Sequence, residues 1–360
     1  MRRHPALLVL LGLVAGLLLG GSAVAVAAPK DTCDKLFTKS STSKLKAYLD
    51  CREDRQDAAL ARIEARLAAM PTTGAESPTT SPKPSASPTS TSKPSPSSSP
   101  TTNPPKPAGF PDASSTGVPA GTTLKAYSGP STITADGTVI DGKKITSCLV
   151  VKADDVTIKN SLISSSCFFN VLADDGGRRL LLSDVEIDGR NNAGSDSAVA
   201  GGGYTCLRCD VHGTIDGFKA GTDVTIKDSW IHDLAMTDDS HNDGIQSLGT
   251  TSLKVQHNTI VLGDGATSAV MLSTGSADAM RNVSIDGNLL GGGAFTVYGG
   301  YQAGTDAKSK VSGIAITDNR FSTRIHPKSG AFGPLTSTDS PVSVSGNTWY
   351  DGPNAGASVG

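Results

Sequence analysis

The sequence predicts an all-β protein whose main domain is a solenoid of short stacked strands. Three observations support this prediction. Among the 360 residues are 40 Gly and 20 Pro, which interrupt helices. Residues 108–360 contain 25 Asp but one Glu, Glu186, together with abundant Gly, Ser and Thr, as in turns and strands. A short phrase also recurs along this region at nearly regular intervals.

Composition and charge exclude several classes of protein. Hydrophobic residues make up 37% of the chain, too few for a polytopic membrane protein and too many for a wholly disordered one. The formal charge of -2 conceals an acidic main region, because residues 108–360 carry 26 acidic and 18 basic side chains. We therefore expect no nucleic acid partner.

The first 27 residues have the features of a secretory signal peptide. Arg2 and Arg3 precede an apolar run from Ala6 to Leu19, and residues 25–27 (Ala-Val-Ala) form a small-residue cleavage pattern. A retained membrane anchor is the alternative, but the run is shorter than the ~20 residues that a span requires. We expect a secreted, extracellular protein with no membrane contact after signal cleavage.

Two segments follow the signal peptide. Residues 28–70 contain Cys33, Cys51 and apolar residues at helical spacing, which predicts a small helical segment with one disulfide. Residues 71–109 are mostly Pro, Ser and Thr with scattered Lys, which predicts a disordered, extended linker. We assign no chemistry to either segment.

The recurring phrase begins with an apolar residue and ends two places later with a residue type that tolerates positive φ. It occurs nine times at an average spacing of 25.5 residues, and its last position is Gly, Asn, Asp or His in eight copies. A strand, a one-residue left-handed corner and a second strand describe one coil of a solenoid. The copies are Ile140-Asp141-Gly142, Ile158-Lys159-Asn160, Leu182-Ser183-Asp184, Leu207-Arg208-Cys209, Ile226-Lys227-Asp228, Val255-Gln256-His257, Ile285-Asp286-Gly287, Ile316-Thr317-Asp318 and Val344-Ser345-Gly346.

A β-sandwich is the alternative architecture for many short strands, but no Asn-Gly hairpin signal recurs. The repeats, with phrases such as the one running from Val224 to Ile231, resemble the right-handed parallel β-helix of the pectate-lyase-like group. The resemblance covers residues 110–352 and leaves 353–360 as a tail. It implies the fold without fixing the activity, since lyases, hydrolases, epimerases and adhesive proteins share this fold.

The resemblance also implies a register between coils. The segment 216–222 lies directly below 243–250, so Phe218 and Ile245 point inward. Period-two alternation then sends Lys219 and Gln246 outward, and Met271 continues their column.

The cysteines of the main domain follow the same geometry. Cys148 and Cys167 occupy matching positions one coil apart, within disulfide range. Cys206 and Cys209 span a corner, where we expect a local disulfide. A redox thiol pair and a zinc site are the alternatives, but no βαβ pattern surrounds these residues and no second ligand pair exists.

The densest cluster of titratable residues lies in the loop 236–243 and beside it. Three carboxylates and an imidazole fall within six residues, next to outward-facing Lys219 of the coil below. Because the resemblance implies that catalytic grooves follow this sheet, we expect the active site here. The candidate catalytic residues are Asp243, His241, Lys219, Asp239 and Asp216, and the candidate substrate-binding residues are Gln246, Asp238 and Tyr298.

Two reactions on an extracellular polysaccharide fit these residues. β-Elimination needs a base, Lys219 or His241, and a cation such as Ca²⁺ on the aspartates that neutralises the uronate carboxylate. An acidic domain binds an acidic glycan only with Ca²⁺ or a local basic patch. Glycoside hydrolysis needs two carboxyl groups beside the scissile bond, which Asp216 with Asp243, or Asp239 with Asp243, would supply.

Simpler explanations stay open for the same residues. Asp216 and Asp243 in adjacent coils also fit a hydrogen-bonded stack of turn residues, and His241 also fits an ordinary solvated loop residue. Tyr298 follows three glycines, which fits a tight bend as well as an aromatic sugar platform. A non-catalytic glycan-binding or surface-attachment solenoid is therefore the alternative function.

Overall fold

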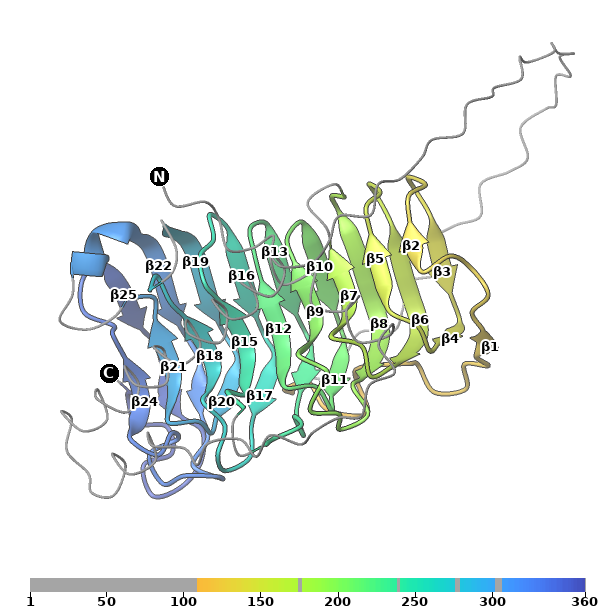
Figure 1. Cartoon of the computed structure of the whole chain (residues 1–360). Helices are drawn as coiled ribbons and strands as arrows, with labels where there is room; N and C mark the ends of the chain where they lie inside the picture. The colour runs from red at the N-terminus through yellow and green to blue at the C-terminus, as the bar shows by residue number, and fades with distance from the viewer. Residues whose placement is uncertain (1–108, 174–176, 238–239, 276–278, 302–305, 360) are drawn as a thin grey trace, which may run out of the picture. The chain divides into compact units, whose positions relative to one another are not determined.

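The structure is a computed structural model that describes residues 109–359, with gaps at 174–176, 238–239, 276–278 and 302–305. The expected signal peptide, helical segment and nearly all of the linker lie outside the described residues. Parallel strands stack coil upon coil across the described part of the chain (Figure 1). The all-β class and the parallel β-helix are thus confirmed. The described residues include no helix with the length and apolar character needed to cross a membrane.

One side of each coil contributes to a nine-stranded parallel sheet. Its strands pair in the order in which they occur along the chain. They are β2 (Thr132–Ile133), β5 (Leu149–Val151), β7 (Phe169–Ala173), β9 (Ser197–Gly201), β12 (Asp216–Ala220), β15 (Asp243–Ser247), β18 (Ser268–Leu272), β21 (Phe295–Gly299) and β24 (Gly333–Thr336).

The rest of each coil belongs to a seventeen-stranded sheet that turns at the corners. Its strands are β1 (Lys125–Ala126), β3 (Val139–Asp141), β4 (Lys143–Ile145), β6 (Thr157–Ser164), β8 (Leu180–Asp188), β10 (Tyr204–Leu207), β11 (Asp210–His212), β13 (Val224–Lys227), β14 (Trp230–Ile231), β16 (Leu253–Gln256), β17 (Thr259–Val261), β19 (Met280–Asp286), β20 (Leu289–Gly291), β22 (Val311–Thr317), β23 (Arg320–Phe321), β25 (Val342–Ser345) and β26 (Thr348–Trp349). A short 3-10 helix, η4 (Asp306–Lys310), precedes β22.

The corners confirm eight of the nine repeat phrases. In these eight, the last residue of the phrase has a φ between 47° and 69°. The fourth copy was placed one residue too late, because Cys206 pairs with Ile226 and the left-handed residue is Arg208, with φ 51°. Arg208 is not a residue type that favours this region, but its guanidinium binds both oxygens of Asp184 at 2.6 Å.

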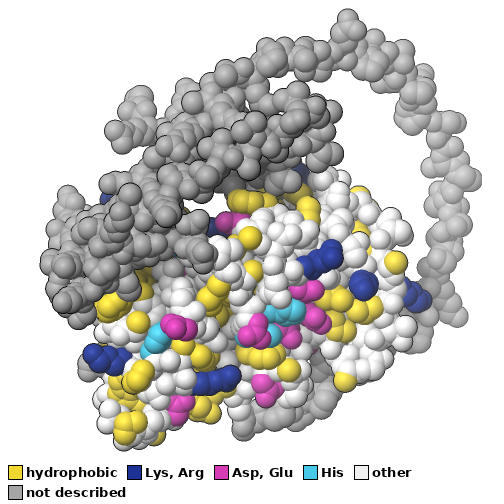
Figure 2. Space-filling model, turned by 60° about the horizontal axis from the view of Figure 1, so that its bottom comes forward, with side chains coloured by type: hydrophobic (Ala, Val, Ile, Leu, Met, Phe, Trp, Pro, Cys, Tyr) yellow, Lys and Arg dark blue, Asp and Glu magenta, His cyan; other side chains and the backbone are white. Residues whose placement is uncertain are grey.

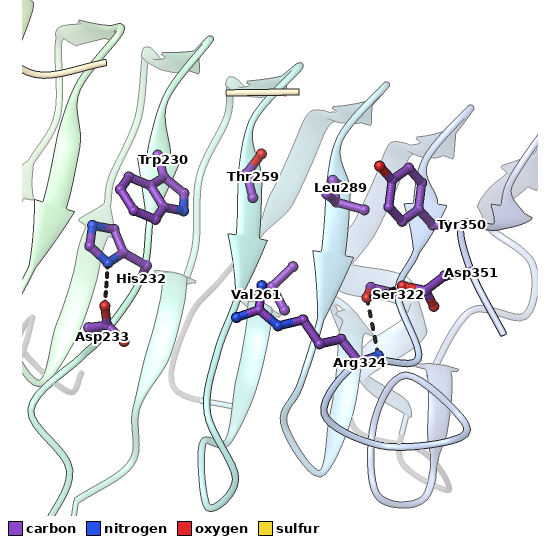
Figure 3. Close-up of a pocket in the computed structure, with 10 residues that line it drawn as sticks. All are labelled: Trp230, His232, Asp233, Thr259, Val261, Leu289, Ser322, Arg324, Tyr350 and Asp351. Carbon is purple, nitrogen blue, oxygen red and sulfur yellow. Dashed lines mark hydrogen bonds and ion pairs between the residues drawn. The ribbon is translucent and has the colours of Figure 1, made fainter. Parts of the chain in front are cut away.

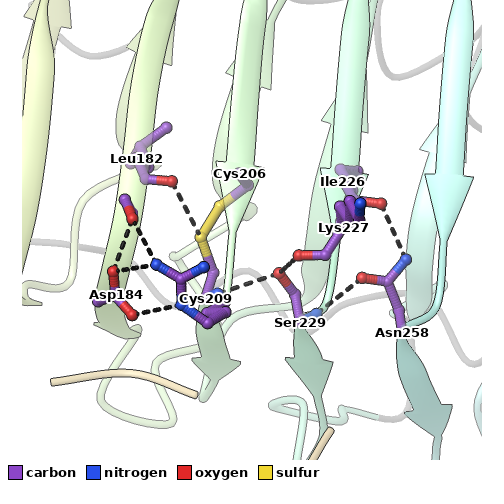
Figure 4. Close-up of a disulfide and its surroundings, with 10 residues drawn as sticks. Leu182, Asp184, Cys206, Cys209, Ile226, Lys227, Ser229 and Asn258 are labelled. Atoms are coloured by element: carbon purple, nitrogen blue, oxygen red, sulfur yellow. Dashed lines mark hydrogen bonds and ion pairs between the residues drawn. A yellow bond between two sulfur atoms is a disulfide. The ribbon is translucent and has the colours of Figure 1, made fainter. Parts of the chain in front are cut away.

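Both expected disulfides of the main domain are present. Cys148 and Cys167 link neighbouring coils, and Cys206 and Cys209 span the corner at Arg208 (Figure 4). Cys206 and Cys209 are bonded to each other as expected, so neither sulfur is free to bind zinc in this structure.

A row of buried asparagines lies immediately after the corners of the later coils. This asparagine row consists of Asn258, Asn288, Asn319 and Asn347, all at most 1% exposed. Each side-chain oxygen accepts a hydrogen bond from the backbone amide of the residue one coil before, as from Asn258 to Asn288 at 2.8 Å. Each side-chain amide donates to a backbone carbonyl, as from Asn288 to Val255 at 2.9 Å. In the preceding coil Ser229 takes the corresponding place beside Asn258 (Figure 4).

The interior between the sheets is apolar, and the chain end closes one side of it. Phe218 and Ile245 pair across β12 and β15 and are fully buried, as the register predicts. The segment expected as a tail folds back along β26. There the backbone amide of Val359 donates to Asn347, and the Val359 side chain is 5% exposed.

Candidate active site

The site lies on the outer face of the nine-stranded sheet, where β12 and β15 begin. Lys219 pairs with Gln246, Gln246 with Met271, and Met271 with Tyr298, so these residues form one outward column. This confirms the outward direction expected for Lys219, Gln246 and Met271.

Two glycines place Asp216 and Asp243 on the same side as this column. A side chain at Gly217 would meet Ile231, and one at Gly244 would meet Ile260, so both positions face the core. Since Phe218 and Ile245 also face the core, the alternation is broken, and the aspartates preceding the glycines lie outside. Strict alternation would have turned both carboxyl groups inward.

Lys219 joins two carboxyl groups from neighbouring coils. Its Nζ lies 3.1 Å from Oδ2 of Asp216 and 3.2 Å from Oδ2 of Asp196, which precedes β9. It also donates to Gln246 Oε1 at 3.3 Å. The Lys219 side chain is 31% exposed, whereas that of Asp216 is 2% exposed. We call Asp196, Asp216, Lys219 and Asp243 the Lys219 cluster.

Asp243 is bound from three directions. Its Oδ1 accepts from Ser268 Oγ at 2.5 Å, and its Oδ2 accepts from Gln246 Nε2 at 3.2 Å. Its backbone amide donates to Asp216 Oδ1 at 2.9 Å. Asp243 is only 1% exposed. The hydrogen bond expected between the stacked Asp216 and Asp243 is therefore present, and the Gln246 side chain covers Asp243.

Burial dominates the electrostatics of the cluster. It raises the pKa of Asp216, with Lys219 opposing and Asp243 adding to the rise. It also raises the pKa of Asp243, against hydrogen bonds from Ser268 and Gln246, and that of Asp196, against the charge of Lys219. For Lys219 itself, burial lowers the pKa, but Asp216 and Asp196 outweigh burial and raise it. Lys219 is thus an ammonium near neutral pH.

Asp196 was not among the residues chosen from the sequence. It precedes β9, one coil below Asp216, and its side chain is 24% exposed. The available signal was the pairing of β9 with β12, which brings residues 197 and 216 together. The irregular corner at Arg208 lies between those strands and obscured this pairing.

The loop before β15 is only partly described. Asp238 and Asp239 lie outside the described residues, so their roles stay predictions. His241 is half-buried two residues before β15. Its neighbour Asn242 is buried and donates to the carbonyls of Ile215 and Ala235 at 2.7 and 2.9 Å, which fixes the end of this loop on the coil below.

Tyr298 continues the outward column two coils beyond Gln246. Its ring contacts Phe295 edge-on, and its hydroxyl is buried without a hydrogen bond to any described residue. Burial raises the pKa of Tyr298, and the Asp243 charge adds to the rise. The structure thus places Tyr298 on the expected face, while substrate binding by it stays a prediction.

The cluster does not fit a calcium ion as it stands. Calcium takes six to eight oxygen ligands, yet the oxygens of Asp216 and Asp243 are already engaged by Lys219, Gln246, Ser268 and a backbone amide. Among the described residues, no group of three or more His, Cys, Asp or Glu side chains is arranged to hold a metal ion. We derive no catalytic step through a metal.

The architecture is that of a parallel β-helix. Among solved structures, pectate lyase Pel9A is similar to this chain, with 15% sequence identity and a TM-score of 0.39. The similarity covers 64% of this chain and 62% of that protein, and it concerns the fold alone. No protein-family model and no curated protein matches the chain.

Proposed function

We propose that this protein is a secreted enzyme that cleaves an extracellular polysaccharide by glycoside hydrolysis at the Lys219 cluster. One observation carries the proposal. The carboxyl oxygens of Asp196 and Asp216 contact the same ammonium at 3.2 and 3.1 Å. The two oxygens thus lie at most about 6 Å apart, near the ~5 Å separation of carboxyl groups in retaining glycosidases.

The raised pKa values suit a division of labour between these carboxyl groups. Burial raises the pKa of both carboxyl groups, and it raises that of Asp216 to about 8, so Asp216 keeps a proton near neutral pH. Asp216 is therefore the general acid that protonates the leaving oxygen, and it becomes accessible when the partly exposed Lys219 side chain moves aside. Asp196, the more exposed carboxyl group, is the nucleophile that attacks the sugar carbon.

Charge favours hydrolysis over elimination. Two carboxyl groups contact one ammonium and the carboxyl group of Asp243 lies near it, so the face does not attract an acidic sugar. Lys219 is also held protonated by its partners, which removes it as the base of β-elimination near neutral pH. The two disulfides fit the oxidising environment of an exported protein.

β-Elimination is the second candidate, because Lys219 is a partly exposed cation on this face. In that reaction Lys219 would neutralise a uronate carboxylate, and His241 would remove the proton. In this reaction Lys219 neutralises the sugar carboxylate, whereas the sequence analysis considered Lys219 as the base.

The test is a panel of neutral and acidic polysaccharides, each with and without Ca²⁺. New reducing ends report any cleavage, and ultraviolet absorbance reports the unsaturated product that only elimination forms. We expect reducing ends without absorbance, and their loss in the Asp196→Asn variant. Asp223→Asn is the matched control, since Asp223 is an exposed turn aspartate whose φ of 59° Asn also tolerates.

Each other outcome has a defined meaning. Ultraviolet absorbance from the unsaturated product would show that the reaction is elimination and not hydrolysis. Binding without either signal on any polymer would support the non-catalytic glycan-binding solenoid. Equal loss of activity in both variants would show that Asp196 has no specific part in the reaction.

A further inference from the structure

A groove on the other sheet has the features of a separate sugar-binding site. It crosses the outer face of β14, β17, β20, β23 and β26, beyond the corner from the asparagine row. Its cavity volume is about 180 Å³, the size class of a single sugar ring. Its lining includes Trp230, Thr259, Arg324 and Tyr350 (Figure 3).

Two aromatic side chains mark the ends of this groove. Trp230 lies at the first coil, and its indole stacks on His232 with ring centroids 3.4 Å apart. His232 is fixed in turn by Asp210 at 2.8 Å and Asp233 at 2.7 Å. Tyr350 lies four coils further along and is 49% exposed. At ~4.8 Å per coil, the two rings stand about 19 Å apart along the stack, enough for several rings of an extended glycan.

The strands between the aromatic rings pack closely beneath the groove. Gly291 lies between Val261 and Ser322 on neighbouring coils, and a side chain there would come within 3.4 Å of both. Thr259 and Val261 line the groove, and Thr259 is only 8% exposed.

Neighbouring groups engage the two acidic side chains that line the groove. Asp351 accepts hydrogen bonds from Ser322 at 2.9 Å and from the Thr323 amide and hydroxyl at 2.5 and 2.6 Å. Burial alone would raise the pKa of Asp351, but these hydrogen bonds outweigh burial and lower it. Asp233 is paired with His232.

Arg324 is different from these acidic groups. It is exposed, and its guanidinium forms no hydrogen bond or ion pair with the described residues. In Figure 3 its side chain reaches across the groove toward Val261. Figure 2 shows histidine side chains (cyan) set among acidic ones (magenta) on one face of the domain.

We propose that this groove binds an acidic polysaccharide, with sugar rings against Trp230 and Tyr350 and a sugar carboxylate on Arg324. Aromatic faces supply flat apolar contact, and guanidinium binds a carboxylate in bidentate fashion. The groove lies on a different sheet from the Lys219 cluster and needs no titratable pair. It is an attachment site rather than a second active site, and it does not rest on the hydrolysis proposed above.

The test is calorimetric titration of the full chain with oligogalacturonate and with the same oligosaccharides methyl-esterified. The protein carries Asp196→Asn, so that cleavage does not interfere. We expect binding of the acidic form, and about tenfold weaker binding after esterification or in the added Arg324→Gln variant. Tyr350→Ala, at the exposed rim, should weaken both forms.

Controls separate this proposal from the one for the Lys219 cluster. Arg281→Gln removes another exposed arginine and should leave binding unchanged. Lys219→Met should also leave it unchanged. Equal affinity for the two forms of the oligosaccharide, or unchanged affinity in the Arg324→Gln variant, would overturn the proposed acidic-sugar site. Loss of binding in Lys219→Met but not in Arg324→Gln would place the binding site on the nine-stranded sheet.

Discussion

Two rows of buried polar side chains run along this β-helix, and they solve the problem of burial differently. In the asparagine row, each amide both donates and accepts, so every member satisfies its neighbours. In the row at the start of the nine-stranded sheet, Asp216 and Asp243 are equally buried, but their carboxylates only accept. Lys219 is the partner of Asp216, and Gln246 donates to Asp243.

The difference separates a structural device from a candidate reactive one. Neutral asparagine amides can be stacked on every coil, because each coil supplies the hydrogen-bond donor that its neighbour requires. Carboxyl groups repeated in the same way raise one another's pKa, as burial and Asp243 do for Asp216. Burying such groups costs stability, which is the usual sign of a functional site.

The largest effect is expected for Lys219→Met. The Lys219 charge lowers the pKa of Asp216 and Asp196, so its removal should raise both pKa values further. Turnover should fall by about 100-fold or more, and any remaining activity should shift to higher pH. A pH–rate profile checks this, with Lys219→Arg as the variant that keeps the charge. An unshifted profile would separate Lys219 from the two carboxyl groups.

The next largest effect should fall on the asparagine row, and on stability alone. Asn288→Ala leaves the carbonyl of Val255 and the amide of Asn258 buried without partners. We expect a loss of about 2–4 kcal/mol in the free energy of unfolding, with turnover per folded molecule unchanged. Denaturant unfolding measures this loss. A loss below about 0.5 kcal/mol would mean that water replaces the amide.

A smaller effect should distinguish the two rows by their response to pH. The folded pKa of Asp216 is raised, so the folded state binds more protons than the unfolded one above about pH 4. Stability should therefore fall as the pH rises through the raised pKa, and Asp216→Asn should flatten this decline. Melting temperatures at about pH 5 and about pH 8 provide the comparison. Asn288→Ala, which removes no titratable group, should keep the slope of the parent.

The smallest effect on stability is expected for His212, whose charged partners are partly exposed. A hydrogen bond to Glu186 raises the pKa of His212 against burial, and Asp210 and Asp188 add to the rise. Its stabilising contribution is complete below about pH 6.5 and is lost as the pH rises through the folded pKa. His212→Gln should cost about 0.5 kcal/mol at acidic pH and nothing at alkaline pH, because the pair is partly screened. Equal costs at both pH values would assign the effect to packing.

The repeat pattern predicted the coils well because it is a backbone signal. Residues that enter the left-handed region cheaply occupy eight corners, and the same spacing placed Lys219 beside Gln246. It failed at Arg208, where a side-chain pair with Asp184, rather than a permissive residue type, holds the backbone. No local pattern reveals such a pair.

The site was harder to predict than the fold, since contacts between coils depend on the exact register. Asp196 escaped notice because the slip at the fourth phrase hid its place below Asp216. The asparagine row had a readable signal, an Asn directly after four successive corner residues, His257, Gly287, Asp318 and Gly346. The burial of Asp216 and Asp243 had none, because it follows from the core-facing glycines beside them.

The folded-back chain end also affects how copies of this molecule meet. A stack of parallel strands finishes in unpaired backbone groups, which invite a second stack to dock and grow into filaments. Here residues 356–359 hydrogen-bond to Trp349 and Asn347 and cover the β26 part of that edge. Removing this segment would uncover the edge, and end-to-end self-association is the consequence to look for in shortened versions of the protein.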